Sequence, residues 1–112
     1  MYSSYWACCS GGASGVEVIE THFAWIFMVG PHAYKMKKPV HYFDLDLRSL
    51  AARKRNCEEE VRLNRRLAPD VYYGVVPLAR TADGTLQVAA EGEPVDWLIW
   101  MRRLPAHLML DR

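Results

Sequence analysis

A lysine and a glutamate in this sequence are placed so that together they could position the phosphates of a nucleotide. Side chains alternate in character along a predicted β-strand, which puts Ala33 and Lys35 on the same face. Glu60 lies on a predicted helix, three and seven residues before the apolar Leu63 and Leu67, at the edge of the buried stripe. A lysine partner within about 4 Å would offset much of the cost of burying this carboxylate. The pair therefore predicts an ammonium group directed at phosphate oxygens.

A lysine on a strand is weak evidence when taken alone, because many such lysines are solvated edge residues that discourage aggregation. Lys37 and Lys38 follow on the same segment, and we expect solvated examples among them. The second half of the pair, supplied by the run Glu58-Glu59-Glu60, is what favours a nucleotide site.

The elements that must carry the pair are predicted strands and one long helix. Alternating or continuous apolar segments predict strands at residues 16–22, 23–29, 33–40, 71–79, 85–89 and 97–102. Residues 42–48 are predicted to be a short connector, and Ser49 is a good N-cap for a helix over residues 50–67 that ends at Ala68-Pro69. We predict an α+β fold, an antiparallel sheet of about five strands with the helix after the third strand.

The predicted helix has one apolar and one charged face. The apolar stripe consists of Leu50, Cys57, Val61, Asn64 and Leu67 or Ala68, widened by Leu63, and the opposite face carries Arg53, Arg55, Glu58, Arg62 and Arg66. We interpret the charged face as solvated, with pairs such as Glu58 with Arg62. The alternative is an RNA-binding α+β module that would also use aromatic side chains.

Composition indicates a single folded domain, which we expect to be cytoplasmic. The 112 residues are 51% hydrophobic, and the net charge of +1 gives no general attraction to nucleic acid or anionic lipid. No apolar stretch approaches the roughly 20 residues of a membrane span. The three cysteines and four histidines lack zinc-ligand spacing, so no metal site is predicted. Residues 1–15 are predicted to be a flexible leader without the features of a signal peptide.

Several motifs, in the same order along the chain, resemble a bacterial aminoglycoside phosphotransferase-like family of small-molecule kinases, which has a protein kinase-like fold. They are residues 18–27 (VIETHFAWIF), 33–40 (AYKMKKPV), 57–70 (CEEEVRLNRRLAPD), 73–77 (YGVVP) and 101–105 (MRRLP). The resemblance implies that residues 16–105 form the amino-terminal lobe of such a kinase. It also implies that residues 106–112 begin a truncated second-lobe helix after the hinge.

The family also implies roles for individual residues. Lys35 would contact the α- and β-phosphates and Glu60 would hold it, as in the kinase signature of a strand lysine paired with a helix glutamate. Ala33 is small enough to leave room for the adenine ring on the same face. The strand that ends at Met101 would lead to the hinge, where the backbone of Arg102, Arg103 and Leu104 would bind the adenine edge. The turn near residues 20–24 would cover the phosphates, although no G-x-G-x-x-G motif occurs.

The groups that transfer a phosphoryl group are not predicted in this chain. In these folds the catalytic base and the Mg²⁺ ligands come from the second lobe. His107 and Asp111 have the wrong spacing, and the D-x-D of Asp44 and Asp46 precedes the helix, where capping or solvation explains it better. We thus expect ATP and Mg²⁺ to serve the full-length family, with no catalytic or metal residue here.

Two other interpretations stay open. The chain could be a noncatalytic nucleotide-binding or interaction module that keeps only the sheet and helix. As a lone lobe it would expose the surface that normally meets the carboxy-terminal lobe, and it could self-associate through that surface. We expect no membrane partner, and the near-zero net charge argues against a nucleic-acid partner.

Overall fold

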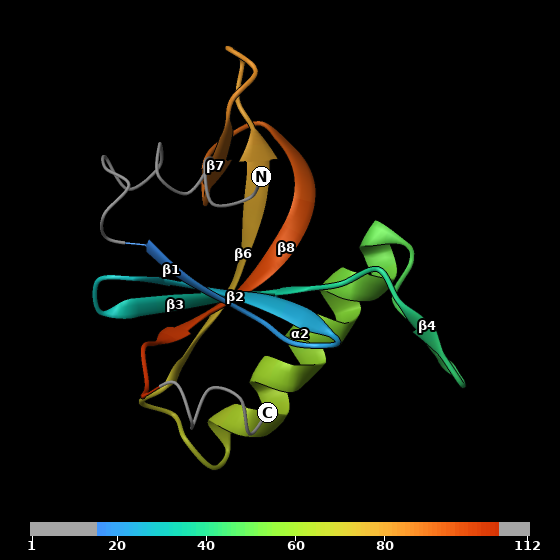
Figure 1. Cartoon of the computed structure of the whole chain (residues 1–112), viewed down its shortest axis with the longest axis vertical. Helices are drawn as coiled ribbons and strands as arrows, with labels where there is room; N and C mark the ends of the chain where they lie inside the picture. The colour runs from blue at the N-terminus through green and yellow to red at the C-terminus, as the bar shows by residue number, and fades with distance from the viewer. Residues whose placement is uncertain (1–15, 106–112) are drawn as a thin grey trace.

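The computed structural model describes residues 16–105, which form one curled antiparallel sheet and, within that range, one helix (Figure 1). The strands are β1 (Val16–Glu20), β2 (Ala24–Val29), β3 (His32–Lys37), β6 (Tyr72–Arg80), β7 (Leu86–Val88) and β8 (Glu93–Arg102). Their spatial order is β1-β2-β3-β8-β6-β7. The predicted α+β class is confirmed, and the short β7, which pairs with β6, brings the sheet to six strands. The predictions for residues 1–15 and 106–112 concern segments outside the described residues.

Strand β3 lies in the interior of the sheet, between the apolar strands β2 and β8. In the register of the sheet, Lys35 is opposite Ile26 of β2 on one side and Ile99 of β8 on the other. Residues i and i+2 of a strand share a face, so Ala33, Lys35 and Lys37 all point to the same side. The sheet therefore places Lys35 among buried neighbours.

Helix α2 (Leu50–Arg65) packs across the sheet against β6 and β8 (Figure 1). The predicted N-cap is confirmed, because the Ser49 hydroxyl accepts a hydrogen bond of 3.1 Å from the Ala52 amide. Cys57 and Val61 are buried in the core between helix and sheet. The helix cannot cross a membrane, since it is too short and too polar, and no other helix occurs in residues 16–105.

Two predictions about the helix faces were wrong. Leu63 and Leu67 are 48% and 87% exposed, because they lie at the rim and beyond the end of the helix rather than over the sheet. Arg53 was assigned to the solvated face, but its Nε donates to Asp96 Oδ1 at 3.1 Å and its side chain is only 11% exposed. This ion pair ties the first turn of α2 to β8.

Two turns also differ from the predicted strand boundaries. The segments 16–22 and 23–29 are separated by a turn in which Thr21 Oγ1 accepts hydrogen bonds from the amides of Phe23 and Ala24, at 3.3 and 3.0 Å. The predicted connector at 42–48 contains a hairpin, β4 (His41–Tyr42) with β5 (Leu45–Asp46), which projects away from the sheet (Figure 1). Its short strands carry too few residues for an alternating pattern to be recognised.

Candidate functional site

The predicted pair of Lys35 and Glu60 forms in the structure. The Lys35 ammonium donates a hydrogen bond of 2.9 Å to Glu60 Oε2, and the two side chains are 11% and 17% exposed. The strand supplies the lysine from a central position in the sheet, and α2 supplies the carboxylate from its sheet-facing edge. Glu60 faces the sheet as predicted, but the buried residues beside it on the helix are Cys57 and Val61 rather than Leu63 and Leu67, from which its position was argued.

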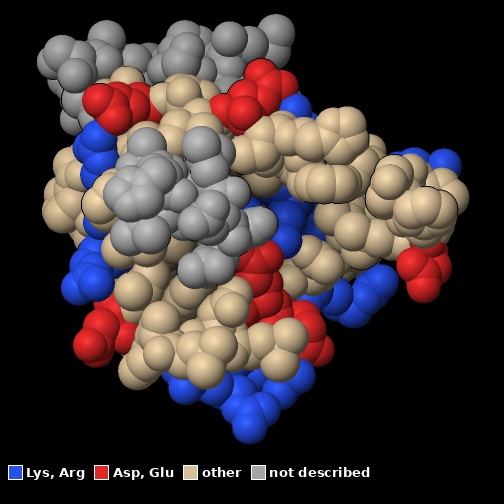
Figure 2. All heavy atoms as spheres, turned by 60° about the horizontal axis from the view of Figure 1, so that its bottom comes forward, with Lys and Arg blue, Asp and Glu red and all other residues tan. Residues whose placement is uncertain are grey.

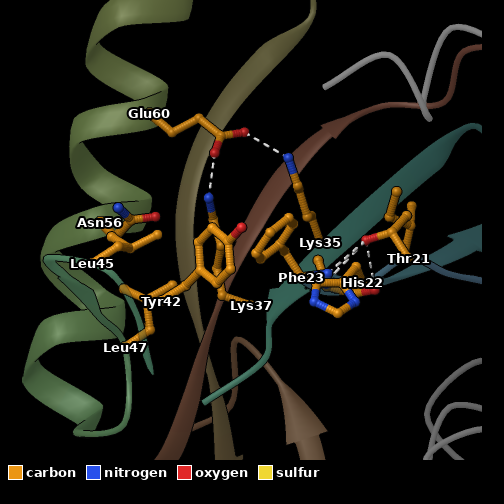
Figure 3. A pocket seen from close by; sticks show the side chains of 12 residues that line it. Thr21, His22, Phe23, Lys35, Lys37, Tyr42, Leu45, Leu47, Asn56 and Glu60 are labelled. Atoms are coloured by element: carbon orange, nitrogen blue, oxygen red, sulfur yellow. Dashed lines mark hydrogen bonds and ion pairs between the residues drawn. The ribbon is translucent and has the colours of Figure 1, made fainter. Parts of the chain in front are cut away.

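A second lysine shares the same carboxylate. The Lys37 ammonium donates to Glu60 Oε1, so that the two oxygens of one glutamate hold two ammonium groups (Figure 3). The side chain of Lys37 is 12% exposed, so it is not the solvated edge residue that the sequence suggested. The signal that could have identified it is its position two residues after Lys35, on the same strand face.

Lys38 points to the other side of β3. Its ammonium pairs with Glu20 Oε2 at 2.5 Å and lies 4.9 Å from the centre of the Trp25 ring. Glu20 is 62% exposed, so this pair is screened by solvent. Of the three lysines in the motif, two therefore face Glu60 and one does not.

The electrostatics of the site keep Glu60 ionised. Burial alone would raise the pKa of its carboxyl group, but the positive charges of Lys35 and Lys37 outweigh burial, and the pKa lies below its ordinary range. Burial also raises the pKa of the Cys57 thiol, to about 11, in the adjacent turn of the helix. At neutral pH the site thus holds a carboxylate, and Cys57 stays a protonated core thiol.

The shared carboxylate forms one wall of a cavity of about 460 Å³ (Figure 3). The cavity lies between the β1–β2 turn, strand β3, helix α2 and the β4–β5 hairpin. Its lining residues are Thr21, His22, Phe23, Ala24, Ile26, Lys35, Lys37, Tyr42, Leu45, Leu47, Asn56 and Glu60. A second hollow of about 360 Å³ shares Lys37, Leu45, Asn56 and Glu60 with the first and continues along α2. Lys37 and Glu60 thus line both spaces, whereas Lys35 lines only the larger one.

Asn56 and Tyr42 are among the lining residues that the sequence did not assign to the nucleotide site. Asn56 precedes Glu60 by one helical turn and brings an amide to the same wall, and i, i+4 spacing could have revealed it. Tyr42 comes from the hairpin, and its ring contacts the Phe23 ring edge-on, with 6.0 Å between the centres. This contact joins the hairpin to the β1–β2 turn at the margin of the cavity, and no local pattern predicts it.

The turn near residues 20–24 lies beside Lys35 and Lys37, and its covering of phosphates stays a prediction. Thr21, His22 and Phe23 all line the cavity. The hydrogen bonds to Thr21 Oγ1 hold the conformation of this turn, which contains no glycine. The turn is therefore in position to contact a ligand held by Lys35 and Lys37.

The residues predicted to contact the base gather at the other end of β3. Ala33 is paired with Met101 across the β3–β8 ladder, and both are buried in the apolar cluster. Arg102 is exposed, while Arg103 forms a 2.5 Å ion pair with Glu17 and Leu104 packs on the cluster. None of these five residues lines the cavity that contains Lys35. The structure thus places these five residues near one end of β3. Lys35 and Lys37 lie further along the same strand, at the cavity.

Comparison with known proteins gives a partial match. No family model matches the chain, and no solved structure matches it. Uncharacterized proteins of Mycobacterium tuberculosis and Mycobacterium bovis are each 39% identical to it over 69 residues. The match covers 62% of this chain and only 14% of either relative, so the chain spans a small fraction of the length of these relatives. Their names assign no activity.

The described residues do not offer a metal-ligand set. No group of three or more His, Cys, Asp or Glu side chains converges within residues 16–105. Glu60 is engaged by two lysines, and Asp46 accepts hydrogen bonds from the backbone amide and the guanidinium of Arg48. Within the D-x-D segment, Asp46 therefore makes a local interaction with Arg48, while the N-cap of α2 is Ser49.

Proposed function

We propose that this chain is the nucleotide-binding lobe of a small-molecule phosphotransferase, with a kinase-like arrangement of sheet and helix. The observation that carries the proposal is the pair of Lys35 and Glu60, joined at 2.9 Å and largely buried at the wall of a cavity. An ion pair with so little exposure costs desolvation energy and adds little net stability. A role in binding a nucleotide would explain why this ion pair is kept at the cavity wall.

In this proposal each element has one task. Strand β3 presents Lys35 to the phosphates of ATP, and α2 supplies Glu60 to orient the ammonium. The turn at Thr21, His22 and Phe23 covers the phosphates. The end of β8, from Met101 to Leu104, approaches the adenine ring, with Ala33 beside it. The size of the cavity suits the phosphate end of the ligand, while the base extends toward β8.

Mg²⁺ at nucleotide sites is held mostly by phosphates, water and one or two carboxylates. Within residues 16–105 no group of three or more His, Cys, Asp or Glu side chains converges. The proposal therefore assigns nucleotide positioning to residues 16–105, and phosphorylation of a hydroxyl group to the protein as a whole.

The experiment is a thermal-shift titration of the 112-residue chain with ATP, with and without Mg²⁺. Binding to the native state raises the unfolding temperature by mass action, and we expect this rise to disappear in Lys35→Ala. Lys54→Ala is the matched control, because Lys54 lies over the Trp97 ring at 4.5 Å and does not line the cavity. A folded sample that shows no response to ATP, or an equal response in Lys35→Ala, would refute the proposal.

The RNA-binding alternative has less support from the arrangement of charges. Arg53 is paired with Asp96, Arg62 with Glu59, and Arg65 donates to the Tyr72 carbonyl at 3.0 Å. Figure 2 shows basic and acidic groups interspersed over one face of the molecule, without a broad patch of one sign. Nucleic-acid binding needs basic side chains that are available to phosphates. Several of these arginines are instead used in holding the fold together.

A further inference from the structure

We infer that Lys37 is a second phosphate-binding residue, and that it gives the cavity the positive charge needed to bind an oligophosphate chain without a metal ion. This inference rests on the proposed function, since it extends the same site. It differs from that function because it assigns the attraction for the anion to Lys37 rather than to the pair of Lys35 and Glu60.

The charge of the lining residues is the first step. An ion pair of Lys35 with Glu60 has no net charge, and by itself it would attract a polyanion only weakly. Among residues 16–105, the carboxylate of Glu60 is the sole acidic group lining the larger cavity, whereas two lysines line it. Lys37 therefore leaves one positive charge in excess at the wall.

The second step is the number of hydrogen-bond donors. A lysine ammonium has three N–H groups. Within the described residues Lys35 and Lys37 each donate to one oxygen of Glu60, so both ammonium groups keep N–H groups for a ligand. Because Glu60 holds both lysines, their charged ends converge on a single point of the cavity wall (Figure 3). Neighbouring phosphates of one chain can be bound there together.

The third step is the shape of the space around Lys37. Lys37 lines both the cavity beneath the β1–β2 turn and the hollow that continues along α2. Asn56 and Glu60 also line both spaces, so the two adjoin at Lys37. Lys35 lines only the larger cavity, and the acidic Glu59, which also lines the hollow, is paired with Arg62. A linear oligophosphate can pass the lysines in this groove, whereas a single phosphate would fill only part of it.

Partial burial strengthens each contact with the ligand. The two lysine side chains are 11% and 12% exposed, and charges in such surroundings are screened less by water and salt than surface charges are. Lys37→Gln removes the charge but keeps a donor for Glu60. The loss of one charge-assisted contact in this setting corresponds to at least about tenfold in affinity.

The test is isothermal titration of the 112-residue chain with inorganic tripolyphosphate, in the presence of a chelator that removes divalent cations. We expect wild-type protein and Lys54→Gln to bind with the same affinity, Lys37→Gln to bind at least about tenfold more weakly, and Lys37→Arg to retain binding. Circular dichroism establishes that each variant is folded. As a readout that needs no variant, the side-chain NMR signals of both Lys35 and Lys37 should shift on titration of the wild-type protein.

The possible outcomes separate this inference from the proposed function. Binding of tripolyphosphate that depends on Lys37, together with ATP binding no tighter than tripolyphosphate, supports the inference and refutes the adenine-binding part of the function. Binding of ATP only with Mg²⁺, at equal affinity in wild type and Lys37→Gln, supports the function and overturns the inference. The inference also fails when folded wild-type protein does not bind tripolyphosphate or when the Lys37 signal does not shift.

Discussion

At the scale of single residues, the account depends on one carboxylate that holds two ammonium groups. Glu60 accepts hydrogen bonds from Lys35 and Lys37, and all three side chains are less than one fifth exposed. Removing either lysine leaves one ion pair intact. Removing the charge of Glu60 leaves two partly buried ammonium groups facing each other, which is the costlier defect.

We therefore predict that Glu60→Gln destabilises the chain by about 2 kcal/mol, less than the roughly 3–5 kcal/mol for breaking a fully buried pair. Lys35→Met should cost less, because Lys37 still neutralises the carboxylate. Urea unfolding, followed by tryptophan fluorescence, measures both free energies of unfolding. Glu58→Gln, at an exposed position on the same helix, is the control. Equal effects of Glu60→Gln and Glu58→Gln would contradict this view of the shared carboxylate.

The pKa of Glu60 makes part of this stability depend on pH. Burial acts to raise the pKa, but the charges of the two lysines outweigh it, so the folded-state pKa lies below the ordinary value of 4.5. A lowered carboxyl pKa stabilises the folded state above the unfolded-state pKa, and this contribution is lost as the pH falls through the folded-state value. We predict that the difference in unfolding free energy between wild type and Glu60→Gln shrinks below pH 4.5. If the difference in unfolding free energy between the two proteins stays constant with pH, the charge of the Glu60 carboxylate does not stabilise the folded state.

The sequence predicted two of the three residues of this cluster. Alternation along the strand and the phase of the helix identified Lys35 and Glu60, because both signals are local. Lys37 satisfied the same alternation but was grouped with Lys38 among the lysines expected to include solvated examples. The β4–β5 hairpin, which lines the same cavity as Lys37, was not predicted either. Similarly, Arg53 looked solvated because its partner, Asp96, lies on a strand far along the chain.

At the scale of the elements, the turns determine where each strand begins and ends. The β1–β2 turn is fixed by Thr21, whose hydroxyl oxygen accepts two backbone hydrogen bonds. The hairpin turn at Phe43 has a φ of 55°, which a non-glycine residue rarely adopts. Neither the Thr21 turn nor the hairpin contains a Gly-Pro or Asn-Gly pair, which would mark a turn in the sequence. The end of β1 and the short strands β4 and β5 were missed for this reason.

Gly92, before β8, has the tightest surroundings of the glycines in residues 16–105. Its φ is 144°, and a Cβ atom there would overlap the backbone carbonyl of Arg80. We predict that Gly92→Ala destabilises the chain by at least about 2 kcal/mol, through backbone strain and this overlap. Gly30→Ala is the matched control, because Gly30 has a φ of 57° with open space around it, and should cost about 1 kcal/mol. Thermal unfolding of the two variants measures the difference, and equal stabilities would show that the turn before β8 relaxes.

At the scale of the whole molecule, the sheet connects two regions that a nucleotide would have to bridge. The lysines and the cavity lie toward one end of β3, and Ala33, Met101 and the end of β8 lie toward the other. The sequence analysis placed Ala33 and Lys35 on one strand and Met101 at the end of another, as the structure has them. The binding roles of the two regions stay predictions. The sequence could not predict that Ala33 and Met101 pack inside the apolar cluster, because packing depends on all the elements that meet there.

Amide NMR spectroscopy of the isotope-labelled chain, titrated with ATP and Mg²⁺, tests the central claim most directly. The account predicts changes at Lys35, in the turn of Thr21 to Phe23 and at Arg102 to Leu104. The same changes should occur in Lys54→Met and be lost in folded Lys35→Met. No change on titration, or changes confined to the exposed helix face around Arg55 and Arg66, would contradict the account.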